Sequence, residues 1–227
     1  MTAPLECLVE VGAKRTFAAA AAWPGWCRSA REEAGALEAL VAYGERYATV
    51  LADGGPRFVP PASVLDLLVV ERAPGNATTE FGAPDAVYDV DAEPVSGPGW
   101  TRLRSIIEVC WTAFDRAATD ADGVALRKGP RGGGRELDAI VAHVAGAEAS
   151  YLRRLTGSTV KVDESDAWAS RLVERAAVLD GLDRAKEGAL PESGPRGGAM
   201  WTPRRFLRRA AWHVLDHAWE IEDRATG

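Results

Sequence analysis

The stretch WTPRRFLRRAAWHVLDHAWEIEDR, residues 201–224, decides the second half of the fold. It predicts one long helix, because Thr202 is a suitable N-cap and Pro203 takes the first helical position, where a missing N–H group is tolerated. His213 and His217 are four residues apart, so their side chains lie one turn apart on the same helix face. That face also carries Phe206, Ala210 and Glu220. The spacing lets two imidazoles reach one metal ion, as in helical zinc sites.

The third histidine of the chain, His143, falls in another predicted helix, residues 137–155. Its helix face is otherwise apolar or small, with Ile140, Ala147 and Tyr151, so the imidazole should point into the interior. A lone histidine on such a face is more often a core residue than a ligand, but here every histidine of the chain lies on an expected inward face. Three imidazoles leave coordination positions for water and substrate, as in catalytic sites. We expect a divalent metal, zinc first, with nickel, iron or copper as alternatives that three imidazoles also accept.

Four segments in the second half each show one apolar stripe, which is typical of amphipathic helices. They are residues 101–118, 137–155, 166–186 and 203–224. In the third of them, the stripe is expected to include Leu172 and Val173. Four helices of this length predict a four-helix bundle in residues 91–227.

Residues 1–90 show a different pattern, with short strands and one helix. Alternating and β-branched residues predict the strands. The expected strands are residues 5–11, 15–23, 64–71 and 78–81. Ser29 with Glu32 three residues later has the spacing of a capping box, which predicts a helix from Ser29 to about residue 51. Because a linker rich in proline, glycine and aspartate follows at 83–99, we expect an α+β fold, with a small α+β domain before the bundle.

The charge and composition exclude several classes of protein. The net charge is −6 and the pI is about 5.2, which argues against a nucleic-acid-binding surface, because phosphate contacts need a basic footprint. No run of 18 apolar residues predicts a membrane span, and no basic segment with an apolar core predicts a secretory signal. Cys7, Cys27 and Cys110 are scattered and odd in number, so we expect a reducing, cytoplasmic location.

Two further side chains are candidates for chemistry. Glu220 lies one turn beyond His217, where it can orient a metal ligand or act as a general base, or instead serve as a partner between helices. Tyr151 follows His143 by about two turns and can donate a hydrogen bond in the pocket, although core packing also explains it. We therefore take Glu220 and Tyr151 as the candidate catalytic residues.

Three arginines are candidates for binding an anionic substrate group. The run Gly-Pro-Arg-Gly-Gly occurs twice, at 129–133 and at 194–198, just before each histidine-bearing helix. Arg131 and Arg196 can therefore flank one end of the bundle and hold an anion, or the two runs can be plain linkers. Arg209 is the arginine nearest to the histidine face, and it can meet Glu220 or an anionic ligand.

The second half resembles the DinB/YfiT-like superfamily. The resemblance rests on four predicted helices, on His143 within AIVAHVAGAEASYL, and on the HxxxH pair within WHVLDHAWEIED, and it covers about residues 100–225. It implies an up-up-down-down bundle, frequently a dimer, and a divalent metal, most often zinc or nickel, at the three histidines. It also implies metal-dependent chemistry, namely transfer involving a low-molecular-weight thiol such as bacillithiol or mycothiol, isomerisation, or hydrolysis.

The first half resembles the HicB-like antitoxin fold over about residues 5–75. The resemblance rests on paired strands, the turn Trp23-Pro24-Gly25, the polar step Arg28-Ser29, and a helix rich in glutamate, alanine and leucine. It implies neutralisation of a toxin or regulation by association. Proteins of that family usually carry a DNA-binding tail, whereas this chain continues into helices.

Three functions follow from these patterns. The first is a metal-dependent transferase or hydrolase that acts on a small molecule at the three histidines. The second is a non-catalytic interaction protein, in which a HicB-like module is joined to a bundle whose metal is structural or lost. The third is a small-molecule binder whose tryptophans line a pocket between the two domains.

Overall fold

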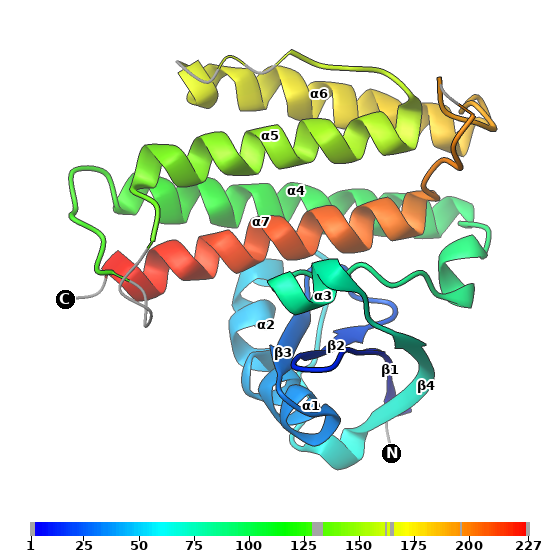
Figure 1. Ribbon diagram of the computed structural model, residues 1–227, viewed down its shortest axis with the longest axis vertical. Coiled ribbons are helices and arrows are strands. Elements are labelled where there is room, and N and C mark those ends of the chain that lie inside the picture. The colour runs from blue at the N-terminus through cyan, green and yellow to red at the C-terminus, as the bar shows by residue number, and fades with distance from the viewer. Residues whose placement is uncertain (1–2, 129–133, 162, 164–165, 196, 226–227) are drawn as a thin grey trace. The chain divides into compact units, whose positions relative to one another are not determined.

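The computed structural model describes residues 3–128, 134–161, 163, 166–195 and 197–225 (Figure 1). The chain separates into two compact units. The first contains Met1–Val109 and Leu207–Trp212, and the second contains Cys110–Phe206 and His213–Gly227. Four strands in one sheet, together with the helices, confirm the α+β class.

The first unit contains a four-stranded sheet in the order β3-β2-β1-β4 (Figure 1). The strands are β1 (Leu5–Val11), β2 (Thr16–Ala20), β3 (Cys27–Ala30) and β4 (Leu67–Pro74). β1 pairs antiparallel with β2 and parallel with β4, and β2 pairs antiparallel with β3. The two central strands supply most of the buried residues of the sheet, because β1 buries Cys7 to Glu10 and β2 is buried throughout.

The predicted helix from Ser29 to residue 51 is wrong in two respects: it does not begin at Ser29, and it is two helices rather than one. Ser29 belongs to β3, where it pairs with Phe17 and accepts a hydrogen bond from Arg15 Nη1 at 3.3 Å. Sheet pairing thus uses the residue that local spacing assigns to a helix cap. The helical region is divided into α1 (Glu33–Ala42) and α2 (Gly44–Ala52). Gly44 permits a close approach there, because a Cβ atom on it would lie 3.0 Å from the Pro60 Cβ.

The predicted strand at 78–81 is also wrong, because these residues form the short helix α3 (Ala77–Phe81). Asn76 caps it, since Asn76 Oδ1 accepts from the backbone N–H groups of Thr78 (2.7 Å) and Thr79 (3.4 Å). Thr79 Oγ1 accepts in return from Asn76 N–H at 2.7 Å. This reciprocal cap satisfies the first amides of a helix, so helix formation prevails over the β-propensity of two threonines.

Two 3-10 turns complete this part of the chain. η1 (Val64–Asp66) takes the start of the expected strand 64–71, and strand β4 begins after it. η2 (Asp89–Ala92) lies inside the expected linker 83–99, so that segment has structure of its own.

Four long helices follow, with bounds close to those expected. They are α4 (Gly97–Asp120), α5 (Leu137–Thr156), α6 (Ala167–Lys186) and α7 (Pro203–Ala225). All three chain boundaries between the units fall within helices, one in α4 and two in α7. The expected cap of α7 is present, because Thr202 Oγ1 accepts from Arg205 N–H at 3.3 Å. α5 and α6 run side by side (Figure 1), and Gly181 allows this, since a Cβ there would lie 2.7 Å from Thr156 Cγ2.

The inward face of α6 differs from the predicted apolar stripe. Leu172 and Val173 are exposed, at 60% and 63%, whereas Glu174 and Arg175 are buried. Ion pairs orient this helix, because Arg171 and Arg175 both bind Asp115 of α4, at 3.1 and 2.8 Å. The prediction of an inward face rested on the positions of apolar residues alone, and such a pattern does not include ion pairs between helices. Within the described ranges, no helix has the length and apolarity needed to cross a membrane.

Candidate metal centre

The structure brings the three histidines together in the second unit. His143 comes from α5, and His213 and His217 come from α7. One ring nitrogen of each lies within 4.8 Å of the others. The Nε2 atoms of His213 and His143 are 3.2 Å apart, and the three ring centroids are separated by 4.7–5.0 Å. Two elements that are distant in sequence thus place three imidazole nitrogens around one point.

The separation of the His143 and His213 nitrogens fits a shared ion. Two nitrogens that each lie about 2.0–2.1 Å from a tetrahedral zinc ion are about 3.3 Å apart, close to the observed separation between His213 and His143. His213 and His217 are 6% and 9% exposed, so protein rather than water surrounds the rings. Three neutral nitrogen donors suit zinc and other first-row transition metals better than magnesium or calcium, which prefer oxygen. The residues present therefore fit a divalent transition metal.

The electrostatics of the site favour a neutral imidazole at His143. The pKa of His143 is lowered to about 4, mainly by burial and in addition by the charges of His217 and Arg135, while Glu220 opposes this lowering. A neutral imidazole offers a lone pair, which is the form that binds a metal. Near neutral pH, protons therefore compete only weakly with a metal ion for the lone pair of His143.

Glu220 holds His217 in place. Glu220 Oε2 lies 2.7 Å from His217 Nδ1, and Oε1 accepts from Arg224 Nη1 at 2.8 Å. The hydrogen bond from His217 lowers the pKa of Glu220 most strongly, burial opposes it, and the charges of His217 and Arg224 add to the lowering. An ionised carboxylate only accepts hydrogen bonds, so Nδ1–H of His217 is the donor and Nε2 keeps its lone pair for a ligand.

Arg224 is a residue of the candidate site to which the sequence analysis did not point. Its Nε donates to the Arg127 carbonyl at 2.7 Å, and Arg127 N–H donates to the Arg224 carbonyl at 3.0 Å. Gly134 has φ +145° beside it, and a Cβ there would lie 2.6 Å from Arg224 Nη2. The available signal was the i, i+4 spacing of Glu220 and Arg224, which places opposite charges on one helix face.

Tyr151 lies next to the histidines, as expected from its place on α5. Its ring centroid is 5.8 Å from that of His213, edge to face. The Tyr151 ring also stacks on the Trp201 ring, with 5.5 Å between the ring centroids and 28° between the ring planes. Tyr151 therefore forms one aromatic wall of the site.

Of the three predicted anion-binding arginines, the structure describes only Arg209. Arg131 and Arg196 lie outside the described residues. Arg209 belongs to the first unit, where its Nη1 donates to the Pro84 carbonyl at 2.5 Å and its guanidinium lies 4.9 Å from the Trp212 ring centroid. The expected pairing of Arg209 with Glu220 is replaced by the contacts of Glu220 with His217 and Arg224.

Replacing Glu220 with glutamine should weaken zinc binding about 10–100-fold, because His217 loses the carboxylate that fixes its tautomer and orientation. Competition titration against a chromophoric chelator measures the change. Glu222→Gln is the matched control, since it lies about 200° around the helix from Glu220. Equal zinc affinity in Glu220→Gln and Glu222→Gln would show that the carboxylate does not support a metal ligand.

No other group of three or more histidine, cysteine, aspartate or glutamate side chains with this spacing occurs in the part of the chain that the structure describes. The three cysteines are all buried, and burial raises the pKa values of Cys7 and Cys110, so neither is an activated thiolate. Comparisons with protein-family models, with curated proteins and with solved structures find no match to this chain, so its function has to be inferred from the site itself.

Proposed function

We propose that this protein is a metal-dependent transferase or hydrolase that acts on a small molecule at the three-histidine site. The observation that supports it is the meeting of His143, His213 and His217, with their ring nitrogens within 4.8 Å of one another and His217 oriented by Glu220. Zinc is the first choice of metal, and nickel and iron are the alternatives. The DinB/YfiT-like superfamily is the type of protein that this arrangement resembles.

We further propose that α4–α7 form the four-helix bundle of that superfamily, with homodimerisation as a further expectation from the resemblance. Contacts inside the second unit support the bundle. Trp111 Nε1 of α4 donates to Glu148 Oε1 of α5 at 2.6 Å, and His143 of α5 meets His213 of α7. Facing helices of a bundle commonly donate metal ligands into its core.

The residues of the site divide the work between binding and positioning. A bound ion lowers the pKa of a coordinated water or thiol and thereby provides a nucleophile at neutral pH. Glu220 has one oxygen on His217 and the other on Arg224, so it acts as a positioning residue rather than as a general base. Tyr151 flanks His213 and limits the space in which a substrate can lie. A low-molecular-weight thiol is the co-substrate we propose for a transfer reaction.

A non-catalytic interaction protein is the second candidate. Large apolar side chains on the first unit favour it, because Leu65 and Phe81 are 92% and 91% exposed. Exposed apolar residues of this size mark surfaces that bind partners when they gather in a patch. In this case the HicB-like module would bind a macromolecule, and the metal would be structural or lost.

Metal analysis of the purified protein tests the proposal. We expect close to one zinc per chain in protein from zinc-supplemented cells, and at least a 100-fold loss of affinity in both His213→Ala and His217→Ala, because each removes one of three ligands. Asp216→Asn, on the same helix about 100° from His217, should retain the metal. Circular dichroism checks that the variants are folded.

Two outcomes would contradict the proposal. One is a metal-free wild-type protein after growth with added zinc, nickel or iron. The other is unchanged affinity in both histidine variants. A metal-free protein that copurifies stoichiometrically with a macromolecule would support the second candidate instead.

A further inference from the structure

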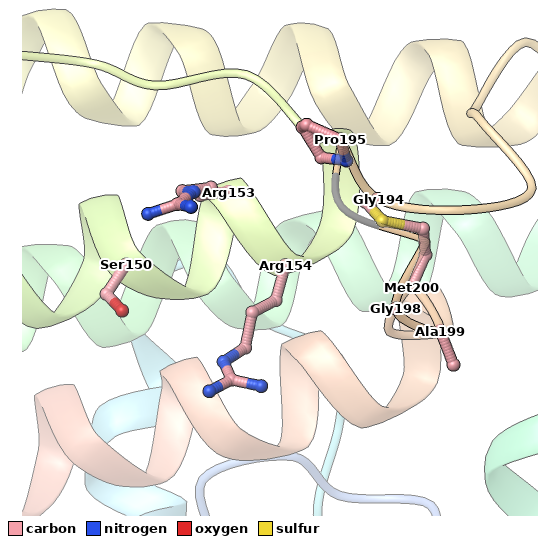
Figure 2. Close-up of a pocket in the computed structure, with 8 residues that line it drawn as sticks. All are labelled: Ser150, Arg153, Arg154, Gly194, Pro195, Gly198, Ala199 and Met200. Carbon is pink, nitrogen blue, oxygen red and sulfur yellow. The ribbon is translucent and has the colours of Figure 1, made fainter.

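A cavity of about 280 Å³ lies at the C-terminal end of α5 (Figure 2). Ser150, Arg153 and Arg154 of α5 form one side of it. The chain before α7 forms the other side, through Gly194, Pro195 and residues 198–200. These lining residues all belong to the second unit, so the cavity shares a compact body with the three histidines.

The lining carries two positive charges and no acidic side chain. Arg153 and Arg154 are both exposed to solvent. Among the described residues, neither guanidinium has a carboxylate partner, and the contact of Arg154 is the ring of Trp201, 5.3 Å from its centroid. A guanidinium offers a planar fork of N–H donors that matches a carboxylate or a phosphate. The cavity is therefore suited to an oxyanion.

Trp201 fixes this end of the site. Its backbone N–H donates to the Arg154 carbonyl at 2.8 Å, which ties the chain before α7 to α5. The Arg205 guanidinium lies 4.7 Å from the Trp201 centroid, and Tyr151 stacks on the same ring. Cation–π contacts of this kind reduce the freedom of the arginines before a ligand arrives. The guanidinium group of Arg154 is thus partly pre-organised for binding.

The cavity and the histidines lie along one face of α5. Ser150 and Arg154 follow His143 by seven and eleven residues, which places both within about 20° of its direction around the helix. The rise along the axis is about 10 Å to Ser150 and about 16 Å to Arg154. Tyr151 lies between them and also contacts His213. A ligand on this face can reach both the histidines and the arginines.

We propose that this cavity binds the oxyanion of an elongated substrate, a carboxylate or phosphate group about 10–16 Å from the group that reacts at the histidines. The proposal rests on the proposed function and specifies its substrate class. Arg153 and Arg154 bind the anion, Ser150 offers a hydroxyl donor, and Trp201 positions Arg154. No sequence pattern pointed to Ser150, Arg153 or Arg154 as residues of a site.

Anion titrations test the proposal with inorganic phosphate and succinate as separate probes. Nitrogen–proton spectra of the arginine side chains should shift on titration, and the probe that binds more tightly identifies the phosphate or the carboxylate class. We expect at least a 10-fold weaker dissociation constant in Arg153→Gln and in Arg154→Gln. Arg57→Gln removes the same charge from an exposed arginine outside the cavity and should bind the probe like the wild type.

The metal provides a second and independent measurement. Zinc affinity should be unchanged in Arg153→Gln and Arg154→Gln, so loss of metal binding and loss of anion binding are separate results. In protein loaded with cobalt(II), paramagnetic relaxation of the phosphate ³¹P signal should give a metal–phosphorus distance of roughly 10–16 Å. Phosphate and succinate that bind equally well to both arginine variants and the wild type would overturn this inference, even if the wild type binds zinc. A metal–phosphorus distance outside that range would overturn the inference that one substrate reaches both the cavity and the histidines.

Discussion

Replacing Arg208 with alanine is expected to lower the free energy of unfolding by about 3–5 kcal/mol, because the change leaves a buried carboxylate without its counter-charge. Arg208 and Asp91 are 8% and 3% exposed. Arg208 Nε donates to Asp91 Oδ1 at 3.2 Å, and Nη2 donates to Asp91 Oδ2 and to the Ala86 carbonyl. The guanidinium also lies 4.7 Å from the Tyr88 ring centroid. All of these contacts lie within the first unit.

Urea denaturation followed by tryptophan fluorescence and circular dichroism measures the change in stability. Arg204→Ala removes a less buried arginine from the same helix and should change stability by about 1 kcal/mol or less. In the double variant Arg208→Ala with Asp91→Ala, part of the lost stability should return, since the orphaned charge is removed as well. Equal losses in Arg208→Ala and Arg204→Ala would rule out a strong role for the buried pair.

The second large effect concerns two buried glutamates in the second unit. Glu174 of α6 is fully buried, and neither of its carboxylate oxygens has a hydrogen-bond partner among the described residues. The pKa of Glu174 is raised to about 9, mainly by burial and in addition by the charge of Glu148, while Arg175 opposes this rise. Burial also raises the pKa of Glu148 to about 7, against the lowering effects of Arg175 and of the Trp111 hydrogen bond. Both carboxyl groups therefore hold protons more tightly in the folded chain.

The sign of the pH effect follows from these pKa values. Glutamate in an unfolded chain has a pKa of about 4.3, so the folded state binds more protons between that value and pH 9. Stability should be fully present below about pH 4.3 as far as this pair is concerned, and should fall as the pH rises through 7 and 9. Glu174→Gln cannot ionise, so it should be more stable than the wild type by a few kcal/mol at pH 9, with a much smaller difference at pH 5.

Urea denaturation at pH 5, 7 and 9 checks this prediction. Glu187→Gln, at an exposed position just after α6, should keep the pH dependence of the wild type. A Glu174→Gln variant whose stability declines with pH as steeply as that of the wild type would show that Glu174 is not protonated in the folded protein.

Local signals in the sequence were sufficient for part of the fold. The strand at 5–11 and the three helices that begin near residues 137, 167 and 203 follow from periodicity and from caps such as Thr202. The helix 77–81 also has a local signal, because Asn76 and Thr79 have capping-box spacing, and this cap outweighs the β-propensity of the threonines. Sequence reasoning succeeds at these places because the deciding interactions connect residues a few positions apart.

The three histidines of the candidate site were predictable from the sequence, but the residues around them were not. The i, i+4 spacing placed His213 and His217 on one face, and an inward face was expected for His143. That the Nε2 atoms of His143 and His213 would approach to 3.2 Å depends on how two helices pack. The role proposed for Arg153 and Arg154 depends on a cavity that they line together with the chain before α7, and no local sequence pattern describes this cavity.

The sequence by itself determined the positions of the long helices, the α+β class and the face of α7 that carries two histidines. Only the tertiary structure decided that Ser29 pairs with Phe17 in a strand, that the buried Arg175 of α6 pairs with Asp115 of α4, and that His143 reaches His213. The physical reason is the range of the interactions. Helix periodicity and capping act over three or four residues, whereas sheet pairing, buried ion pairs and shared ligand sites join residues that meet only after the chain has packed.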